Sequence, residues 1–161
     1  MLSFIDNFRI VTSAEKDQTL GFSMRLKLHH INLVHTSVPE LDAFYRDILD
    51  LKDEPGMSEK RKLDEGYPGA VSFMTDGNIQ MHLAEKDLKI GFRTGQAVNP
   101  VERGHIAFRT DDMDAFIARL EEKGVPYSDF GDWAMTGWRQ IFFYDPAGYV
   151  VEVHQVDGED F

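Results

Sequence analysis

The chain of 161 residues has the length of one domain, and its 42% hydrophobic residues, with twelve Phe and two Trp, supply an ordinary globular core. It contains no cysteine, which excludes disulfides and thiolate ligands and leaves nitrogen and oxygen donors for any metal. The formal net charge of −11 disfavours nucleic acid and anionic lipid as partners, and no apolar run has the length of a membrane span.

Residues 1–25 do not share the pattern of the rest of the chain and are interpreted as an N-terminal extension of unknown role. Phe4, Ile5, Phe8 and Ile10 have the spacing of one face of a short amphipathic helix. The opening residues lack the basic start, long apolar stretch and cleavage site of a secretory signal, so a cytoplasmic location is expected.

The first regular segment is a predicted strand from Leu26 to Val34, where apolar and polar residues mix as in a partly buried strand. Ser37 and Glu40 have capping-box spacing, which predicts reciprocal side-chain bonds at the start of a helix. That helix has an apolar face made by Leu41, Phe44, Tyr45, Ile48 and Leu49.

Two short strands are expected next, from Ala70 to Thr75 and from Asn78 to Leu83. Asp76-Gly77 between them is a hairpin turn signal. Residues 86–104 form a predicted connector, in which glycines and Asn99-Pro100 interrupt any regular element.

The same order of elements recurs after the connector. A strand is predicted from Gly104 to Arg109, and a helix from Asp111 to Lys123 with Gly124 as its C′ residue. Further strands are expected near residues 125–129, 138–144 and 149–156.

Particular residues repeat between the two halves. His30-Ile31 opens one half and His105-Ile106 the other, while Leu41-Asp42-Ala43-Phe44 is echoed by Met113-Asp114-Ala115-Phe116. An internal repeat of this kind decides the architecture, and two copies are too few for a solenoid.

We therefore predict an α+β fold in which two βαβββ modules pair into one pseudo-symmetric domain over residues 26–157. The first module covers residues 26–85 and the second residues 105–157, with the connector at 86–104.

Polar residues stand where the repeat is strongest. His30 and His105 occupy equivalent places on the opening strands, and His82 and Glu152 lie on the closing strands. Each alone is more often an ordinary strand residue, but four such residues at corresponding points indicate a metal site. Three imidazoles and a carboxylate suit one divalent ion of Zn, Ni, Co, Fe or Mn.

Period-two alternation turns more residues toward the same interior, namely Asn32, Val34, Gln80, Ala107, Arg109, Val150 and His154. His154 shares the phase of Glu152 and is a candidate partner for its carboxylate. His29 and His35 do not share the phase of His30 and are interpreted as structural or exposed.

Three motifs, Leu28-His29-His30-Ile31, Gly104-His105-Ile106-Ala107 and the stretch from Tyr144 to Val153, make the chain similar to a known family. It resembles the vicinal oxygen chelate superfamily, the group of glyoxalase I, fosfomycin- and bleomycin-resistance proteins, methylmalonyl-CoA epimerase and extradiol dioxygenases. The resemblance runs from about Leu26 to Val156. It implies a pseudo-symmetric open barrel, one ligand from the first and last strand of each module, and frequent homodimers.

The resemblance implies the same four ligands, with one departure. Glyoxalase I usually carries Glu at the place of His82, and the epimerase carries Gln. Gln80 lies two residues earlier on the same face, so a slipped register would make Gln80 the ligand. This departure favours a less characterised glyoxalase-like enzyme over glyoxalase I itself.

The leading hypothesis is a metal-dependent lyase or isomerase of the glyoxalase type, which chelates a small oxygen-rich substrate through two oxygens. Glu152 is the predicted proton shuttle, since a carboxylate exchanges between ligand and base more readily than an imidazole on a strand. Arg109, Asn32 and Trp138 are the predicted substrate contacts.

Two alternatives remain open. An Fe(II) dioxygenase would use His30, His105 and Glu152, and a fourth ligand at His82 argues against it. A metal-free protein that sequesters a drug-like ligand would need aromatic walls instead. Substrate choice depends on the loops at residues 52–69, 86–103 and 130–137, whose conformation is not predictable from the sequence.

Overall fold

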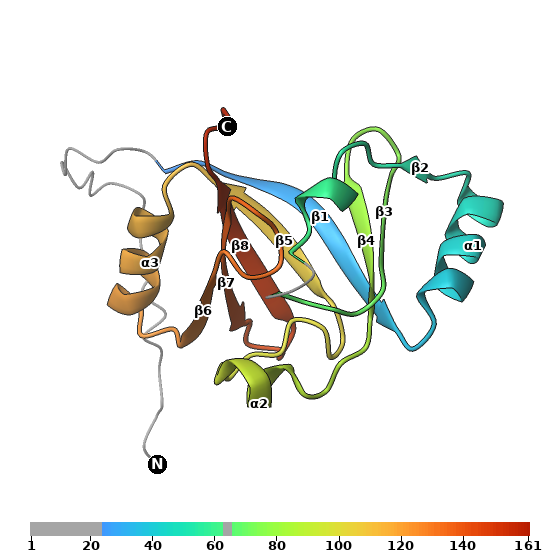
Figure 1. Cartoon of the computed structure of the whole chain (residues 1–161). Helices are drawn as coiled ribbons and strands as arrows, with labels where there is room; N and C mark the ends of the chain where they lie inside the picture. Colours follow the sequence, from blue (N-terminus) through green and yellow to red (C-terminus); the bar gives the residue numbers. More distant parts are fainter. Residues whose placement is uncertain (1–23, 63–65) are drawn as a thin grey trace, which may run out of the picture.

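The computed structural model describes residues 24–62 and 66–161 (Figure 1). The amphipathic helix expected around Phe4 and Ile10 lies outside the described residues. Within the described ranges, no helix is both long enough and apolar enough to cross a membrane.

The described residues form two successive sets of elements. In chain order these are β1 (Leu26–His35), α1 (Val38–Leu49), β2 (Lys52–Asp53), the short 3-10 helix η1 (Ser58–Lys60), β3 (Val71–Thr75), β4 (Gln80–Glu85), α2 (Ile90–Thr94), β5 (His105–Thr110), α3 (Met113–Glu122), β6 (Tyr127–Gly131), β7 (Trp138–Tyr144) and β8 (Val150–Val156). The sets β1-α1-β2-β3-β4 and β5-α3-β6-β7-β8 confirm the two predicted βαβββ modules.

All eight strands belong to one mixed sheet in the order β2-β3-β4-β1-β5-β8-β7-β6. Within each module the opening strand pairs in parallel with the closing strand, β1 with β4 and β5 with β8. The two opening strands pair antiparallel at the centre of the sheet. This arrangement relates the modules by a pseudo-twofold axis and brings both opening histidine strands together.

The pairing register settles which closing-strand residues are equivalent. Asn32 lies opposite His82 in the first module, and Ala107 lies opposite Glu152 in the second. Asn32 and Ala107 each follow the opening histidine of their module by two residues. His82 therefore occupies the position that corresponds to Glu152, and Gln80, two residues earlier, does not.

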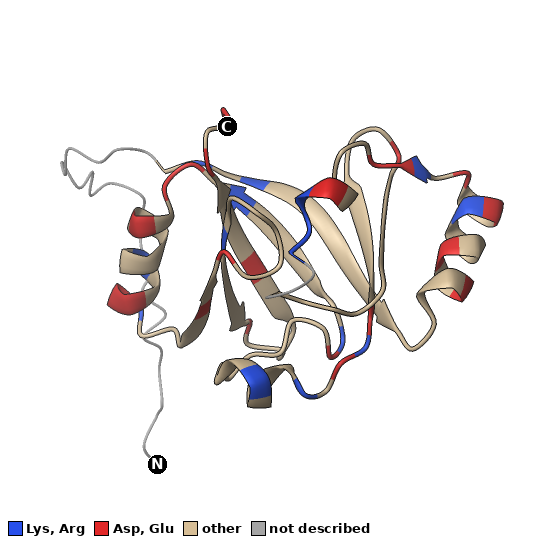
Figure 2. Cartoon of the chain, viewed as in Figure 1, with Lys and Arg blue, Asp and Glu red and all other residues tan. Residues whose placement is uncertain are grey.

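The two long helices cover the outer face of the sheet, one on each module (Figure 1). Val38 of α1 packs against Met74 and Leu83, and Met113 of α3 packs in a cluster with Val153. Acidic residues, coloured red, occur along both helices (Figure 2). Loops cover the opposite, inner face of the sheet.

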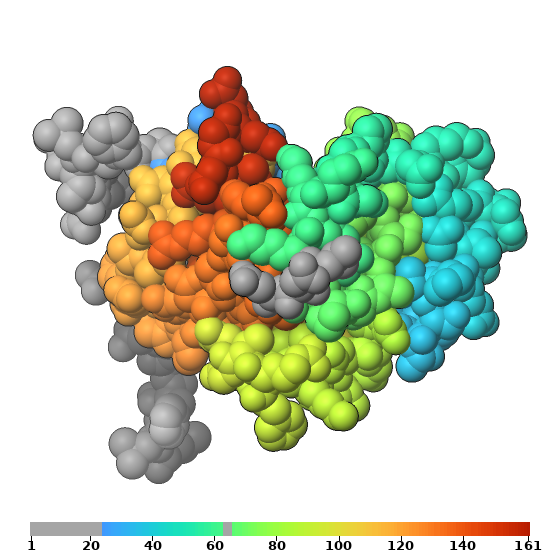
Figure 3. Space-filling model, in the orientation of Figure 1, coloured from blue at the N-terminus to red at the C-terminus, as the bar shows by residue number. Residues whose placement is uncertain are grey.

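The inner face is closed where the two modules meet. Arg61 forms an isolated β-bridge with Met135, and the backbone N–H of Thr136 donates to the carbonyl of Lys60 at 2.7 Å. Figure 3 shows the segment around residues 57–62, in green, against the orange second module. Met57 and Trp138 pack together beneath this contact.

Local expectations for the first helix need two corrections. Ser37 is the N-cap of α1, but its side chain makes no capping bond. Its backbone N–H donates instead to Nδ1 of His35 at 3.1 Å, so the capping box does not form. The apolar face is only partly used, because Phe44 and Ile48 remain 55% and 65% exposed.

Other boundaries shift by a few residues. The hairpin at Asp76-Gly77 is present, but Asp76 accepts bonds from two following amides and β4 begins only at Gln80. The connector is not wholly irregular, since it contains the five-residue helix α2. Gly124 ends α3 as expected, with a φ of +66° that glycine adopts without strain.

Candidate metal centre

Three of the four predicted ligands converge on the inner face of the central strands. Nε2 of His105 lies 2.9 Å from Oε2 of Glu152, and Nε2 of His30 lies 3.6 Å from the same oxygen. Ligand atoms of these three residues lie within 4.8 Å of one another, and all three side chains are buried. The convergence follows from topology, because β1, β5 and β8 are neighbours in the sheet.

The connector orients His105. Its Nδ1 lies 2.9 Å from the carbonyl oxygen of Pro100, which is an acceptor only, so Nδ1 carries the proton in the neutral ring. Nε2 is then left with a lone pair facing Glu152. Gly104 allows this approach, since its φ is +91° and a Cβ there would lie 2.2 Å from the carbonyl oxygen of Asn32.

The second oxygen of Glu152 is held by residues of β7 and β8. Nε2 of Gln140 donates to Oε1 at 3.1 Å, and Nδ1 of His154 lies 3.0 Å from the same oxygen. The indole of Trp138 stacks on His154 with ring centroids 4.3 Å apart. His154 faces the same interior as Glu152, as the strand alternation predicts. The contact of Gln140 with Glu152 is not predicted by the sequence analysis, although a polar residue in an otherwise apolar strand is a signal for it.

The electrostatics of the cluster suit a cation. Burial, partly opposed by the Glu152 charge, lowers the pKa of His30 to about 4, so its imidazole is neutral at physiological pH. Burial alone would raise the pKa of Glu152, but its contacts with His30, His105 and His154 hold that pKa well below its usual range. The result is a buried carboxylate beside neutral imidazole donors.

The donor set fits a divalent ion. Nε2 of His30 is buried and has no hydrogen-bond partner among the described residues. An unpaired buried donor or acceptor is costly, and an ion bonded to that nitrogen would remove the cost. Two imidazoles and one carboxylate are ligands that Zn, Ni, Co, Fe and Mn all accept.

The whole fold matches a known family. A profile described as "Glyoxalase/Bleomycin resistance protein/Dioxygenase superfamily" covers residues 27–153. The chain belongs to this superfamily. The resemblance carried by the three sequence motifs is thereby confirmed, over nearly the same residues.

Individual superfamily members are similar at low identity. "Glyoxylase I 4" of Arabidopsis thaliana is 28% identical over 131 residues, which are 81% of this chain and 71% of that protein. The crystal structure of hypothetical protein BH1468 from Bacillus halodurans has a TM-score of 0.61 at 20% identity, covering 84% and 98% of the two chains. Methylmalonyl-CoA epimerase from Mycobacterium tuberculosis has a TM-score of 0.57 at 17% identity, covering 80% and 87%. The structural likenesses show the superfamily fold.

His82, the fourth predicted ligand, lies in the same chamber in a different arrangement. Its ring stacks on that of His30, with centroids 3.8 Å apart and planes at 20°. Its Nε2 lies 2.9 Å from Oε1 of Gln80, and its nitrogens are not part of the group within 4.8 Å. Its place equivalent to Glu152 supports a ligand role, which stays a prediction.

A β-bulge brings an unexpected histidine to the site. The pairing of β1 with β5 shifts between Leu28 and His30, so His29 is an extra residue and turns inward with His30. Nδ1 of His29 lies 3.0 Å from Nδ1 of His30. Burial and the neighbouring histidines lower the pKa of His29 to about 3, which keeps it neutral. Strict strand alternation predicts that His29 faces away from the side of His30, and the bulge removes that alternation.

The bulge histidine, His29, is expected to strengthen metal binding by accepting a hydrogen bond from the Nδ1–H group of His30. The proton then stays on Nδ1 of His30, and Nε2 of His30 is free as a ligand. We expect His29→Phe to weaken zinc binding about tenfold, and His29→Asn, which keeps an acceptor, to restore much of it. Competition with a fluorescent chelator measures the affinity.

His35→Phe is the matched control, because His35 lies on the same strand and is exposed. Its affinity should equal that of the parent protein. Equal affinities for His29→Phe and the parent would show that the bulge histidine does not support the ligand.

The predicted substrate contacts divide into two groups. Asn32 and Trp138 line a cavity that also contains the three converging residues, with a volume of about 550 Å³ including the space that opens to solvent. Oδ1 of Asn32 and Nε1 of Trp138 are buried without partners among the described residues. Arg109 is not among the lining residues, and its guanidinium pairs with Glu159 at 3.1 Å.

Proposed function

We propose that the protein is a metal-dependent lyase or isomerase of the glyoxalase type, acting on a small substrate with adjacent oxygens. The observation that supports this most is the convergence of His30, His105 and Glu152 within 4.8 Å in the lining of one cavity. When bound, a divalent ion supplies Lewis-acid stabilisation of negative charge that develops on the substrate oxygens.

Glu152 has the surroundings that a proton shuttle needs. Gln140 donates to Oε1, and Nδ1 of His154 lies 3.0 Å from the same oxygen. Oε2 lies 2.9 Å from Nε2 of His105 and 3.6 Å from Nε2 of His30. The low pKa of its carboxyl group keeps it ionised, which is the form required of both a ligand and a base. We propose that it removes a proton from the carbon beside a substrate carbonyl and returns it to the neighbouring carbon.

Asn32 and Trp138 supply polar atoms for the substrate. Their unpartnered Oδ1 and Nε1 lie in the wall of the cavity, one an acceptor and the other a donor. We propose that they orient the substrate between them. The glyoxalase of Arabidopsis thaliana among the relatives supports a substrate of the glyoxalase class.

Turnover of the hemithioacetal formed from methylglyoxal and a thiol tests the proposal. Protein purified without added metal is analysed for its metal content, stripped with a chelator, and reloaded with Zn, Ni, Co, Mn or Fe. We expect turnover that is lost with the chelator and restored by at least one ion. Metal-loaded protein that is inert on hemithioacetals would exclude the glyoxalase reaction, and a failure to take up any ion would leave the metal-free binding alternative.

A second candidate function is an Fe(II) dioxygenase. The group that converges is two histidines and one carboxylate, and His82 lies outside it. Such a triad leaves positions for oxygen and a catechol. Oxygen consumption with catechols, using protein reloaded with iron under anaerobic conditions, is the direct test.

The role of His82 separates the two candidates. We propose His82 as a fourth ligand and expect His82→Ala to weaken zinc binding at least about tenfold, since a direct ligand should matter no less than an outer partner. His35→Ala, at an exposed histidine of β1, is the control, and it should leave the affinity unchanged. An unchanged affinity in His82→Ala would favour the three-ligand dioxygenase.

We also propose a homodimer, supported by apolar side chains on the outer face of the central strands. The bulge at His29 turns Leu26 and Leu28 outward, where they are 41% and 44% exposed, beside Ile106 at 40%. An apolar strip of this kind is typical of subunit contacts. Sedimentation should give twice the mass of one chain, and Leu28→Glu should shift it to the monomer.

A further inference from the structure

One arginine faces the metal cavity. Arg61 lines the same cavity as His30 and Glu152, where the bridge to Met135 joins the two modules. It comes from the segment that closes the inner face, so it approaches the cavity from the side opposite the sheet. A substrate that enters this cavity therefore meets a lining that contains both the ligand cluster and Arg61.

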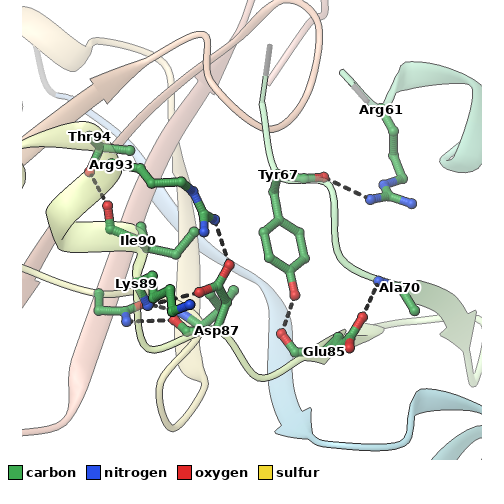
Figure 4. Close-up of polar contacts among 11 residues, drawn as sticks. Arg61, Tyr67, Ala70, Glu85, Asp87, Lys89, Ile90, Arg93 and Thr94 are labelled. Carbon is green, nitrogen blue, oxygen red and sulfur yellow. Dashed lines mark hydrogen bonds and ion pairs between the residues drawn. The ribbon is translucent and has the colours of Figure 1, made fainter. Parts of the chain in front are cut away.

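Among the described residues, only backbone carbonyls accept hydrogen bonds from the guanidinium. Its Nη2 donates to the carbonyl oxygens of Tyr67 at 3.0 Å and Gly69 at 2.8 Å, and the first of these bonds is drawn in Figure 4. Tyr67 is itself anchored, because its hydroxyl donates to the carbonyl of Glu85 (Figure 4). The support is tightly built, since a Cβ on Gly69 would lie 2.2 Å from the Tyr67 hydroxyl oxygen.

This arrangement leaves positive charge directed at the cavity. A guanidinium has five N–H donors and keeps its proton in proteins, although burial lowers the pKa of Arg61 from its ordinary value. The contacts to Tyr67 and Gly69 use one nitrogen, and no carboxylate of the described residues lies within ion-pair distance. Among the described residues, neutral carbonyls orient the group and no carboxylate cancels its charge.

Several other arginines of the described residues have acidic partners. Arg93 pairs with Asp87, Arg139 with Asp114, and Arg109 with Glu159. In a protein with a net charge of −11, a partly buried cation without such a partner in the described residues is unusual. The fork geometry of a guanidinium suits a carboxylate, which it can bind through two bonds.

We propose that Arg61 binds a carboxylate of the substrate, and that the protein selects compact substrates carrying a carboxylate in addition to their metal-chelating oxygens. The inference rests on the proposed chelating function and deepens it. It assigns the anionic subsite to Arg61 and not to Arg109, whose guanidinium is already neutralised by Glu159.

Two chelating probes that share a hydroxamate, one of which adds a carboxymethyl group, test the assignment. Acetohydroxamic acid and succinic monohydroxamic acid present the same hydroxamate, and only the second carries a carboxylate. Their dissociation constants are measured on cobalt-loaded protein from the visible spectrum. Wild-type protein should bind the carboxylated probe about tenfold or more tightly, as expected for a charge-assisted pair.

The preference should disappear in Arg61→Gln, with the cobalt content and the affinity for acetohydroxamic acid unchanged. Arg61→Lys keeps the positive charge and loses the two-pronged guanidinium geometry, so it should retain part of the preference. A partial preference in Arg61→Lys would show that the loss in Arg61→Gln is not caused by misfolding. Arg93→Gln, a surface arginine paired with Asp87, is the control and should keep the full preference.

The outcomes separate this inference from the proposed function. If neither hydroxamate binds the cobalt-loaded protein, chelation fails and the inference fails with it. If both probes bind equally well, or if the preference is lost in Arg109→Gln and kept in Arg61→Gln, the assignment to Arg61 is overturned while chelation stands.

Discussion

Replacement of Glu152 by Gln is expected to reduce metal-dependent turnover by about 10²- to 10⁴-fold, the range that a positioned proton-transfer group contributes. The amide keeps the size of the side chain and the position beside Gln140 and His154, but it neither carries charge nor accepts a proton. Metal affinity should fall as well, because the neutral histidines that remain are a weaker set of donors for a divalent cation. Turnover and metal content are measured on the same preparation.

Glu122→Gln is the matched control for this change. Glu122 is an exposed carboxylate of α3 that pairs with Lys123. It has the same functional group as Glu152 but lies outside the cavity. Full turnover in Glu152→Gln, with metal retained, would contradict both roles given to this carboxylate. Loss of turnover with metal fully retained would separate the proton shuttle from the ligand.

Acid is expected to destabilise the metal-free protein strongly between pH 6.5 and pH 4. The pKa of His30 is about 4 in the folded protein and 6.5 in the unfolded chain, so protons bind the unfolded state preferentially in this window. Stability therefore falls as the pH falls. His30 alone should contribute about 3 kcal/mol, because one pKa unit corresponds to about 1.4 kcal/mol. The buried His82, whose pKa is also lowered, acts in the same direction.

Urea unfolding of chelator-treated protein at pH 7 and pH 4.5 measures this loss. His30→Asn replaces the titrating group by a neutral one and should show a smaller difference between the two pH values. A free energy of unfolding that is equal at both values, or larger in acid, would mean that the buried histidines do not remain neutral in the folded protein.

Much of the fold follows from the sequence because its signals are local. Alternation along the strands, the turn at Asp76-Gly77 and the glycine after α3 are properties of neighbouring residues, and the duplicated motifs multiply them. The same duplication predicts that His30, His82, His105 and Glu152 share one interior. Ligand atoms of three of them, His30, His105 and Glu152, converge because the pairing of β1 with β5 makes their strands adjacent in the sheet.

The outer parts of the site depend on contacts that no local pattern encodes. The bulge at His29 is set by the pairing of β1 with β5, and a shift of one residue reverses which side chains face inward. Gln140 reaches Glu152 only because β7 lies beside β8. The capping box at Ser37 is lost to a competing bond from its backbone to His35.

By itself, the sequence determines two modules, their order and three converging donor side chains, since periodicity and repetition are carried along the chain. The tertiary structure alone decides how the donors are supported and what else enters the cavity. Pro100 orients His105 from the connector, and Arg61 reaches the cavity through a bridge to the other module. Loops adopt such positions by packing against distant strands, and their own residues do not specify the partner.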